Sequence, residues 1–501
     1  MNEMSNAADL RRQLMERMLR GEATPAAAQT QPDPITPRDP ARVLPLTREQ
    51  NQLWLHAQMA PDMPLYNESI TIHRRGAYDH RALEMALSEI VRRHEIWRTS
   101  FHESDGELSQ RVAPPFAIRL PLLDISDMPA EEREAEAHRL ATVDAKAPID
   151  FETAPLFRAR VVKLADDDHR LYLTLHHIIF DGVSIYRTLV PELAALVKAY
   201  EAGQPSPLAE PAIQYGDYAA WQHDQADPET LDRQLDHWRK ALAQPLPRLE
   251  IAGDRPRPGM PTHAGSMEVF ELADDLVAKL KVLARAENAT LYMVLLAAYK
   301  AMLYRYTGDT DIIVGGVTDT RRRPELQPLI GYFLNTMALR SHPAGDQPFR
   351  AYLAEVKASV IGALGASDIP FDRLMRALGI KRGKGTHPLF NTLFSIEPPV
   401  DPFPEGWDLT QMDVVVGAAK YDLYLELDER PSGMDGRFLY STELFDAATI
   451  RRMIAHWTTL LEGIAADPDC TLGRLPMLSA DEQRELVESW NDTAQDRKSV
   501  V

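Results

Sequence analysis

The sequence predicts an α/β protein built from two lobes. Its 501 residues are too many for one ordinary hydrophobic core, and the 45% that are hydrophobic suffice to fill two. Short alternating segments that fit strands are interspersed with amphipathic segments that fit helices, and no short repeat of fixed period runs through them. We therefore expect a mixed sheet covered by helices in each lobe.

Composition narrows the class of protein. The formal net charge of −19 argues against nucleic acid or an anionic membrane as a partner. Cys470 is the only cysteine, so the chain has no disulfide framework and no paired-cysteine metal site, which fits a reducing cytoplasm. No apolar run is long enough to span a bilayer, and the N-terminus lacks the apolar region of a signal peptide.

The N-terminal segment, residues 1–43, differs in composition from the rest. Residues 7–20 fit a short amphipathic helix with Leu10, Leu14 and Met18 on one face, and residues 22–44 are rich in Pro, Ala and Gln. A helix on such a tether can dock a partner protein, and a frayed tail is an equally good interpretation.

Folded sequence starts near Leu44. Thr47 can cap the first helix, with Gln50 at the third helical position as its reciprocal partner. In a first lobe, 44–224, the pattern predicts helices at 47–55, 79–94, 129–143, 186–200 and 215–222 and strands at 69–73, 97–101, 157–164 and 171–177. In a second lobe, 225–475, it predicts helices at 231–243, 274–286, 291–306, 349–364 and 447–465 and strands at 266–270, 311–317, 332–339, 421–427 and 438–441.

The stretch 171–184 carries the best candidate for chemistry. Alternation along the strand sends His176 and His177 to opposite faces, so at most one of them faces a given cavity. The strand ends at Asp181-Gly182, where Asp181 can hold the start of the next helix through backbone N–H groups. An imidazole at a strand end, backed by a carboxylate, suits a base or a proton-positioning group. Two ordinary strand-end histidines and a capping aspartate are the simpler alternative.

The segment His176-His177-x-x-x-Asp181-Gly182 resembles the HHxxxDG motif of condensation domains from nonribosomal peptide synthetases. Six more segments resemble the other motifs of that family in the same order: 49–54, 93–101, 215–222, 330–340, 368–372 and 388–390. The departures are Asn51, Trp97 where Leu is usual, Ala366 and Ser367 in place of His and Gln, and a degraded arginine-serine pattern at 385–387. Seven ordered motifs over most of the folded chain make the resemblance specific.

The resemblance implies two lobes like chloramphenicol acetyltransferase in a V-shaped pseudo-dimer, with the active site at the lobe interface. The implied reaction is attack by the amine of a carrier-bound aminoacyl acceptor on a carrier-bound acyl or peptidyl thioester. His177 is then the catalytic histidine, as general base or as positioner of the amine, with His176 beside it. Gly182 lets the backbone approach the thioester.

Other residues of the motifs receive supporting roles from the same resemblance. Asp181 is the structural aspartate, and Arg93 and Arg98 are the candidates to pair with it. Trp221 supports the site. The candidates for lining the substrate tunnel are Ser184, Asn335 and Tyr332.

The chain shows no motif for a cofactor or a metal of its own. It has no GxSxG nucleophile elbow and no HExxH pattern, and adjacent histidines on opposite strand faces chelate a metal poorly. The resemblance implies substrates carried on the phosphopantetheine of donor and acceptor carrier proteins. Residues 476–501 resemble the start of a linker to an adenylation domain, which makes that domain a further expected partner.

Three enzymatic alternatives and one non-enzymatic alternative share features of these motifs. A plant-type acyl-CoA acyltransferase shares HxxxDG but also carries DFGWG, which is absent from this sequence. His176 argues against a heterocyclisation domain, and the linker-like C-terminus disfavours an epimerisation domain. A non-catalytic docking module that recruits partner enzymes usually has a degraded motif, whereas this one is intact. Segment 66–76 and Trp97 most resemble starter or polyketide-hybrid subtypes, so we expect an acyl or polyketide donor, from an upstream polyketide synthase, acyl-CoA or acyl carrier.

Overall fold

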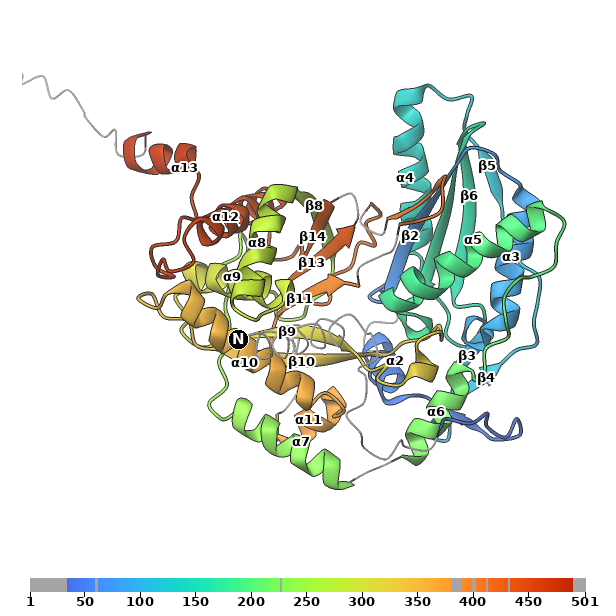
Figure 1. The fold of residues 1–501 in the computed structure, drawn as a ribbon, viewed down its shortest axis with the longest axis horizontal. Helices are drawn as coiled ribbons and strands as arrows, with labels where there is room; N and C mark the ends of the chain where they lie inside the picture. The colour runs from blue at the N-terminus through green and yellow to red at the C-terminus, as the bar shows by residue number, and fades with distance from the viewer. Residues whose placement is uncertain are drawn as a thin grey trace, which may run out of the picture.

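The computed structural model describes residues 34–58, 62–225, 228–380, 389–398, 402–410, 413–430 and 433–489. Two α/β lobes stand side by side like the arms of a V, as the sequence predicts (Figure 1). Each lobe has its own large cluster of buried hydrophobic side chains. Within the described ranges, no helix is long and apolar enough to cross a membrane.

The N-terminal lobe is organised around a five-stranded sheet of order β12-β2-β7-β6-β5. Helices α3 and α5 cover one face and α4 covers the other, and this is why Val161 and Val162 are both fully buried on opposite sides of one strand. A small sheet of order β1-β4-β3 lies beside it. The elements are β1 (Leu44–Pro45), α2 (Arg48–Gln58), β2 (Asn67–Arg75), α3 (His80–Arg93), β3 (Thr99–Ser104), β4 (Glu107–Val112), β5 (Leu122–Asp124), α4 (Ala130–Lys146), β6 (Phe157–Ala165), β7 (Asp168–His176), α5 (Val190–Glu201) and α6 (Tyr215–Asp224).

The C-terminal lobe is organised around a six-stranded sheet of order β10-β9-β11-β13-β14-β8. Helix α9 is apolar on nearly all sides, because it is packed between the sheet and the helices α8, α10 and α12. The elements are α7 (Pro228–Ala241), β8 (Gly265–Leu272), α8 (Asp274–Ala286), α9 (Leu291–Thr307), β9 (Ile312–Asp319), β10 (Leu334–Ser341), α10 (Phe349–Gly365), α11 (Phe371–Ala377), β11 (Thr392–Glu397), β13 (Leu423–Arg430), β14 (Gly433–Ser441), α12 (Ala447–Ala466) and α13 (Ala480–Arg484). This half of the chain also contains β12 (Trp407–Thr410), which belongs to the N-terminal sheet.

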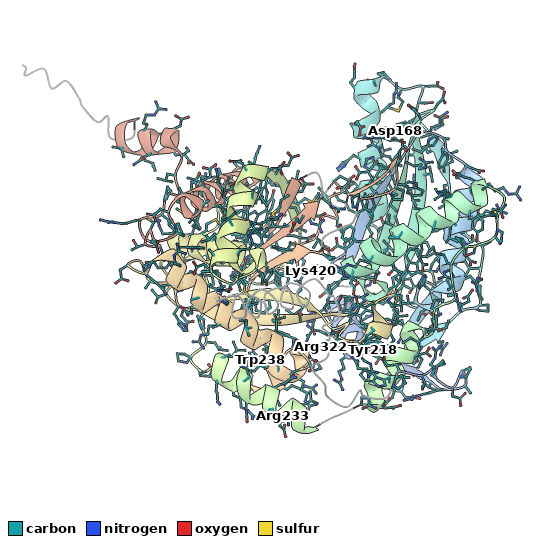
Figure 2. The ribbon with its side chains drawn as sticks, viewed as in Figure 1. Asp168, Tyr218, Arg233, Trp238, Arg322 and Lys420 are labelled. Carbon is teal, nitrogen blue, oxygen red and sulfur yellow. The ribbon has the colours of Figure 1, made fainter. Side chains whose placement is uncertain are left out.

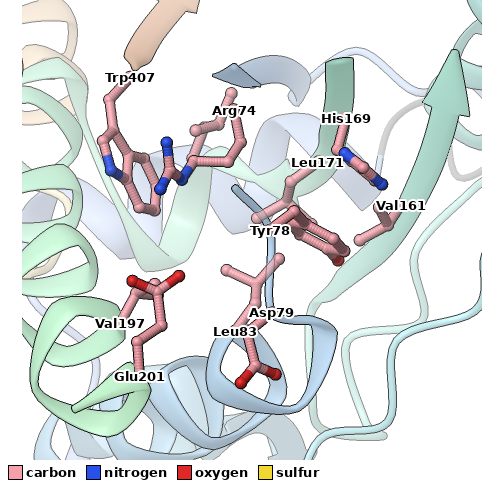
Figure 3. A pocket seen from close by; sticks show the side chains of 11 residues that line it. Arg74, Tyr78, Asp79, Leu83, Val161, His169, Leu171, Val197, Glu201 and Trp407 are labelled. Atoms are coloured by element: carbon pink, nitrogen blue, oxygen red, sulfur yellow. The ribbon is translucent and has the colours of Figure 1, made fainter. Parts of the chain in front are cut away.

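Strand β12 leaves the C-terminal half of the chain and completes the N-terminal sheet. It pairs antiparallel with β2, Trp407 opposite Arg74, and the Arg74 guanidinium lies 5.5 Å from the centre of the Trp407 ring. Figure 3 shows both side chains beside Tyr78, whose ring stacks on His169 at 4.0 Å. The strand therefore ties the two lobes together by backbone pairing and by side-chain contact.

The connection between β9 and β10 also crosses between the lobes. The hairpin extends from the C-terminal lobe to α2 and the small sheet (Figure 1). Four apolar side chains of its tip belong to the N-terminal hydrophobic cluster, namely Leu326, Leu329, Ile330 and Phe333. The two lobes are thus not two separate stretches of sequence, although we expected a division near residue 224.

The predictions for the N-terminal part of the chain have different outcomes. The predicted cap is confirmed, since Thr47 N–H donates to Gln50 Oε1 and Gln50 N–H donates to Thr47 Oγ1, both at 3.1 Å. Residues 34–43, expected in the tether, instead lie on the N-terminal lobe, where Ile35 is buried and Arg38 forms salt bridges with Glu95 and Asp217. The predicted helix at 7–20 lies outside the described residues.

Five strands were missed, and the strand predicted at 97–101 begins later. The missed strands are β1, β4, β5, β11 and β12, each of six residues or fewer, too short to show a clear alternation. Trp97 lies in a 3₁₀ turn, Glu95–Arg98, and the strand starts only at Thr99. The helix after Asp181 begins with a π-helical turn, Ser184–Leu189, before α5.

Candidate active site at the lobe interface

The end of β7 is held in place by residues from two other segments. The strand stops at His176, and His177–Ile179 form a 3₁₀ turn. The His177 N–H donates to the carbonyl of Tyr66 at 2.8 Å, and Gln50 Nε2 donates to the carbonyl of Ile178 at 3.1 Å. The capped N-terminus of α2 therefore fixes the backbone of the turn that carries His177.

His177 faces a cavity between the lobes. Its Nδ1 lies 2.8 Å from the carbonyl oxygen of Phe180. A carbonyl only accepts hydrogen bonds, so Nδ1 carries the proton in the neutral ring and Nε2 carries the lone pair. Burial and, second, the nearby ammonium of Lys420 lower the pKa of His177, which keeps the ring neutral at pH 7. Among the described residues, Nε2 has no hydrogen-bond partner.

His176 points the other way. Its Nδ1 accepts the N–H of Ile178 at 3.2 Å, and the edge of Phe151 contacts its ring at a centroid distance of 4.5 Å. Burial, with His177 and Lys420 as further causes, holds the pKa of His176 well below its usual value. The residue does not line the cavity. The two histidines therefore point in opposite directions, as expected, although His177 lies in the turn after the strand and not in the strand itself.

Asp181 belongs to a closed, fully buried cluster. Its carboxylate forms a bidentate pair with Arg321, at 2.7 Å to Nη1 and 2.9 Å to Nη2. It also accepts the N–H groups of Ser184 and Phe333, each at 2.9 Å, and the Ser184 hydroxyl at 2.8 Å. Asp319 contacts the same guanidinium at 2.8 Å. The cluster joins the turn after β7 to the β9–β10 connection.

The predicted pairing of Asp181 with Arg93 or Arg98 is wrong. Arg93 pairs with Glu192 of α5 and donates to the carbonyl of Ala209. Arg98 donates to backbone carbonyls of Val91 and Ala113. Both are packed too firmly into their own surroundings to reach Asp181. The partner of Asp181 is Arg321, which lies 140 residues further along the chain. In the sequence, the run of three arginines at 321–323 was the only feature that could have indicated a cation there.

The three tunnel candidates lie in different places. Tyr332 lines the cavity, with its ring against the edge of His177 at a centroid distance of 5.2 Å. Ser184 lies in the Asp181 cluster, where its hydroxyl also bonds Arg321, so it does not line the cavity. Asn335 is turned away as well, because its amide donates to the carbonyls of Ser367 and Ile369.

Trp221 lies behind the site, where Arg323 covers its ring at 5.2 Å and Tyr218 stacks on it. Nearby, Tyr215 donates its hydroxyl to the carbonyl of Tyr332 at 2.6 Å. Gly331 has no room for a side chain, since an added Cβ would overlap the Tyr215 ring. Tyr215 and the packing around it therefore fix the backbone of Tyr332 on the side away from the cavity.

The cavity has a volume of about 90 Å³ and draws residues from both lobes. From the N-terminal lobe His56, Tyr66 and His177 line it, and from the C-terminal lobe Leu393, Tyr424 and Arg437 do. A second cavity of about 30 Å³ adjoins it and shares Glu68, Lys420 and Arg437 with it. The two cavities together form a hollow between the lobes, with His177 on its wall.

Charged side chains separate the two cavities. Arg437 of β14 pairs with Glu426 of β13 at 2.9 Å and with Glu68 of β2 at 3.3 Å. Lys420 lies between the lobes (Figure 2), 3.8 Å from Glu68. Burial lowers the pKa of Lys420 against the opposing effect of Glu68 and Glu426. We did not expect any of these residues at the site, because they lie outside the motifs and on strands whose alternation only indicates a buried face.

No group of three or more His, Cys, Asp and Glu side chains is placed to hold a metal ion in the part of the chain that the structure describes.

A family model for the condensation domain matches residues 41–487, which is nearly all of the folded chain. The chain belongs to the condensation-domain family. Members of this family are acyltransferase-type enzymes that form amide bonds in nonribosomal peptide synthetases.

Similar proteins include several such synthetases. The chain is 39% identical over 454 residues to one of the subunits of the linear gramicidin synthase of Brevibacillus parabrevis, covering 90% of the chain and 9% of that protein. It is 36% identical over 489 residues to the phosphinothricin tripeptide synthetase PhsC of Streptomyces viridochromogenes, covering 95% of the chain and 44% of that protein. The chain thus spans less than half the length of either relative.

Solved condensation domains share the fold. The first condensation domain of the calcium-dependent antibiotic synthetase matches with a TM-score of 0.77 at 21% identity, over 88% of this chain and all of that one. The starter condensation domain of rhizomide synthetase matches with a TM-score of 0.76 at 20% identity, over 87% of this chain and 98% of that one. The X-domain in complex with OxyB from teicoplanin biosynthesis matches with a TM-score of 0.76 at 25% identity, over 90% of this chain and all of that one. The V-shaped arrangement of two lobes is therefore the arrangement of the family.

Proposed function

We propose that this condensation domain joins a carrier-bound acyl or peptidyl thioester to the amine of a carrier-bound aminoacyl group, with His177 acting on the amine. One observation supports this most strongly. The Nδ1–H of His177 is held by the carbonyl of Phe180, so the neutral ring presents the Nε2 lone pair on the wall of the interlobe cavity.

In the proposed reaction the acceptor nitrogen attacks the thioester carbonyl carbon. A C–N bond forms, the C–S bond breaks, and the proton lost by the nitrogen is matched by the proton that the leaving sulfur gains. In one role, Nε2 accepts a hydrogen bond from the amine and thereby orients the lone pair of the amine nitrogen. In the other role, Nε2 takes the proton from the amine. Both roles need the neutral ring. The lowered pKa of His177 supports that protonation state at neutral pH.

The remaining candidate residues act by holding His177 and the backbone around it. Asp181, through Arg321 and Phe333, fixes the turn after His177 to the opposite lobe. His176 packs behind the turn. Gly182 allows close approach on the cavity side, where it lies against Glu397. Carrier proteins that present phosphopantetheine thioesters and a downstream adenylation domain are the proposed partners.

The test is condensation between two loaded carrier proteins, read by intact-protein mass spectrometry. His177→Ala should abolish most amide formation with little change in melting temperature, because among the described residues the ring makes a single side-chain hydrogen bond. His342→Ala, an exposed histidine outside the cavity, is the matched control and should condense like the wild type. Turnover by His177→Ala close to that of the control would contradict the proposal.

A non-catalytic docking function is the second candidate. It is favoured by the likeness to the teicoplanin X-domain, which was solved in a complex with OxyB. The same assay separates the two candidates. A wild-type chain that forms no amide with any pair of loaded carriers would favour docking over catalysis.

For the donor we propose an acyl or polyketide chain, not a peptide that ends in a D-residue. The support is the resemblance of segment 66–76 and of Trp97 to the starter and polyketide-hybrid subtypes. Acyl-carrier and D-peptidyl-carrier donors offered in competition test the proposal. Preference for the D-peptidyl donor would contradict it.

A further inference from the structure

The wall of the cavity opposite His177 carries more carboxylates than cations. Glu68, Glu397 and Glu426 line it together with Lys420 and Arg437, and the pair Asp428 and Arg430 adjoins them on β13. They come from β2, β11, β13 and β14 and from the segment before β13. With every group ionised, the cluster carries one unmatched negative charge.

Three of the four carboxylates have a partner. Glu426 pairs with Arg437 at 2.9 Å, Glu68 lies 3.3 Å from the same guanidinium, and Asp428 pairs with Arg430. Arg430 also donates to the hydroxyl of Tyr186 at 2.9 Å. The cations are thus already engaged by carboxylates other than Glu397.

Glu397 is the carboxylate left over. Within the described residues it has neither an ion pair nor a hydrogen bond. Burial, together with the negative charges of Glu426, Asp428 and Glu68, raises the pKa of Glu397 well above its usual value, and the positive charge of Arg437 opposes this. The Glu397 side chain is half-buried. A carboxylate that is partly withdrawn from water without a protein partner is costly, and a cation that enters the cavity would lower that cost.

The position of Glu397 indicates which cation would bind to its carboxylate. It is the last residue of β11, and its carboxylate reaches across to the other lobe, where a Cβ added to Gly182 would overlap Oε2. Gly182 is five residues after His177, and all three residues line one cavity. The proposed reaction delivers to this cavity a primary amine, which at neutral pH is largely an ammonium.

We propose that Glu397 binds the amino group of the acceptor and holds its nitrogen within reach of His177. The inference deepens the proposed function and rests on it. An ammonium beside the carboxylate and a free amine beside the carboxylic acid contain the same number of protons. One N–H bond breaks, one O–H bond forms, and the electron pair stays on the nitrogen that attacks the thioester. Glu397 thus recognises the amine in its charged form and leaves it neutral.

The test compares amine and hydroxyl acceptors. Glu397→Gln keeps the shape of the side chain and removes its ability to become the carboxylate that pairs with an ammonium. Binding of a non-hydrolysable aminoacyl-pantetheine amide, measured by titration calorimetry, should weaken by roughly 10- to 100-fold, the range expected for a lost charge-assisted hydrogen bond. Binding of the matching 2-hydroxyacyl analogue, which carries no charge, should not change.

Kinetics give a second readout. In Glu397→Gln the KM for the aminoacyl carrier should rise, whereas the KM for the donor carrier should stay that of the wild type. Glu429→Gln is the matched control, because Glu429 lies on β13 outside the cavity and pairs with Lys281. It should leave both constants unchanged.

The outcomes separate the two proposals. If the wild type condenses but Glu397→Gln binds amine and hydroxyl analogues with unchanged affinity, the role of Glu397 is refuted and the proposed function stands. Equal weakening for both analogues would also refute it, since loss of cavity shape and not of charge would then be the cause. Retained turnover in His177→Ala refutes the proposed function, while the calorimetric comparison still reports on Glu397.

Discussion

Two clusters of charged side chains lie at the same lobe interface, one around Asp181 and Arg321 and one around the cavity. They differ in how many of their carboxylate oxygens accept a hydrogen bond from the protein. Both carboxylate oxygens of Asp181 are filled by Arg321, by backbone N–H groups and by the Ser184 hydroxyl. In the cavity cluster the Glu397 carboxylate has no partner among the described residues and faces open space. Similar residue types thus form a closed joint in one place and a wall that can receive a ligand in the other.

The comparison teaches that burial of a charge does not by itself mark a binding residue. Asp181 and Arg321 are fully buried, yet neither of them lines the cavity. Their contribution is to fix the turn after β7 against the β9–β10 connection. A residue becomes a candidate for binding when its polar atoms face a cavity and remain unfilled, as do Nε2 of His177 and the carboxylate of Glu397.

The largest expected effect comes from opening the closed cluster. Arg321→Met leaves Asp181 and Asp319 buried without their cation, which should lower the free energy of unfolding by about 3–5 kcal/mol. Urea denaturation measures this. Arg322→Met is the matched control, since Arg322 is partly exposed and pairs with Asp368 at the surface, so its loss should cost at most about 1 kcal/mol. Equal losses in the two variants would remove the distinction between the clusters.

A buried lysine in the C-terminal core extends the comparison to a cation that has no carboxylate partner among the described residues. Lys300 is fully buried, and its ammonium donates only to neutral oxygens, the carbonyl of Leu339 and the hydroxyl of Ser341, both at 2.7 Å. Burial lowers its pKa from 10.5 to about 7, with Glu355 and Asp311 opposing weakly. Between pH 7 and 10.5 the unfolded chain therefore holds a proton that the folded chain has lost.

The sign of the pH dependence follows from this difference. The destabilisation is complete below pH 7 and disappears as the pH rises toward 10.5. The free energy of unfolding of the wild type, relative to Lys300→Met, should rise by about 1.4 kcal/mol per pH unit from pH 7.5 to 9. Denaturation at several pH values measures it, with Lys279→Met, an exposed lysine, as control. A flat difference would mean that Lys300 titrates normally.

The smallest expected effect on stability is at the glycine of the motif. Its φ angle is accessible to alanine, and an added Cβ would meet mainly the flexible end of Glu397. Gly182→Ala should therefore change the free energy of unfolding by less than about 1 kcal/mol and yet raise the KM for the acceptor by moving that carboxylate. Gly365→Ala, where a Cβ meets nothing within 4 Å, is the control. In the double variant Gly182→Ala, Glu397→Gln, additive effects would show that the two residues act separately.

Local features were predictable because they rest on local physics. The alternation of apolar residues predicted β7 up to its end at His176, and the Thr47–Gln50 cap followed from residue types at a fixed spacing. The ordered motifs led to the two-lobe fold and to His177 as the residue to examine. Long, strongly patterned elements such as α9 and α12 were found within a few residues of their true ends.

Contacts between distant segments were decided by the tertiary structure. Arg93 and Arg98 are nearer to Asp181 along the chain, but Arg321 reaches it because the β9–β10 connection crosses to the other lobe. Glu397 lies on a strand that the sequence pattern did not reveal, and it meets Gly182 only across the lobe interface. Residue types and spacings determine which groups each element carries; which of those groups remains without a partner depends on how every neighbouring element packs, and no local pattern encodes that.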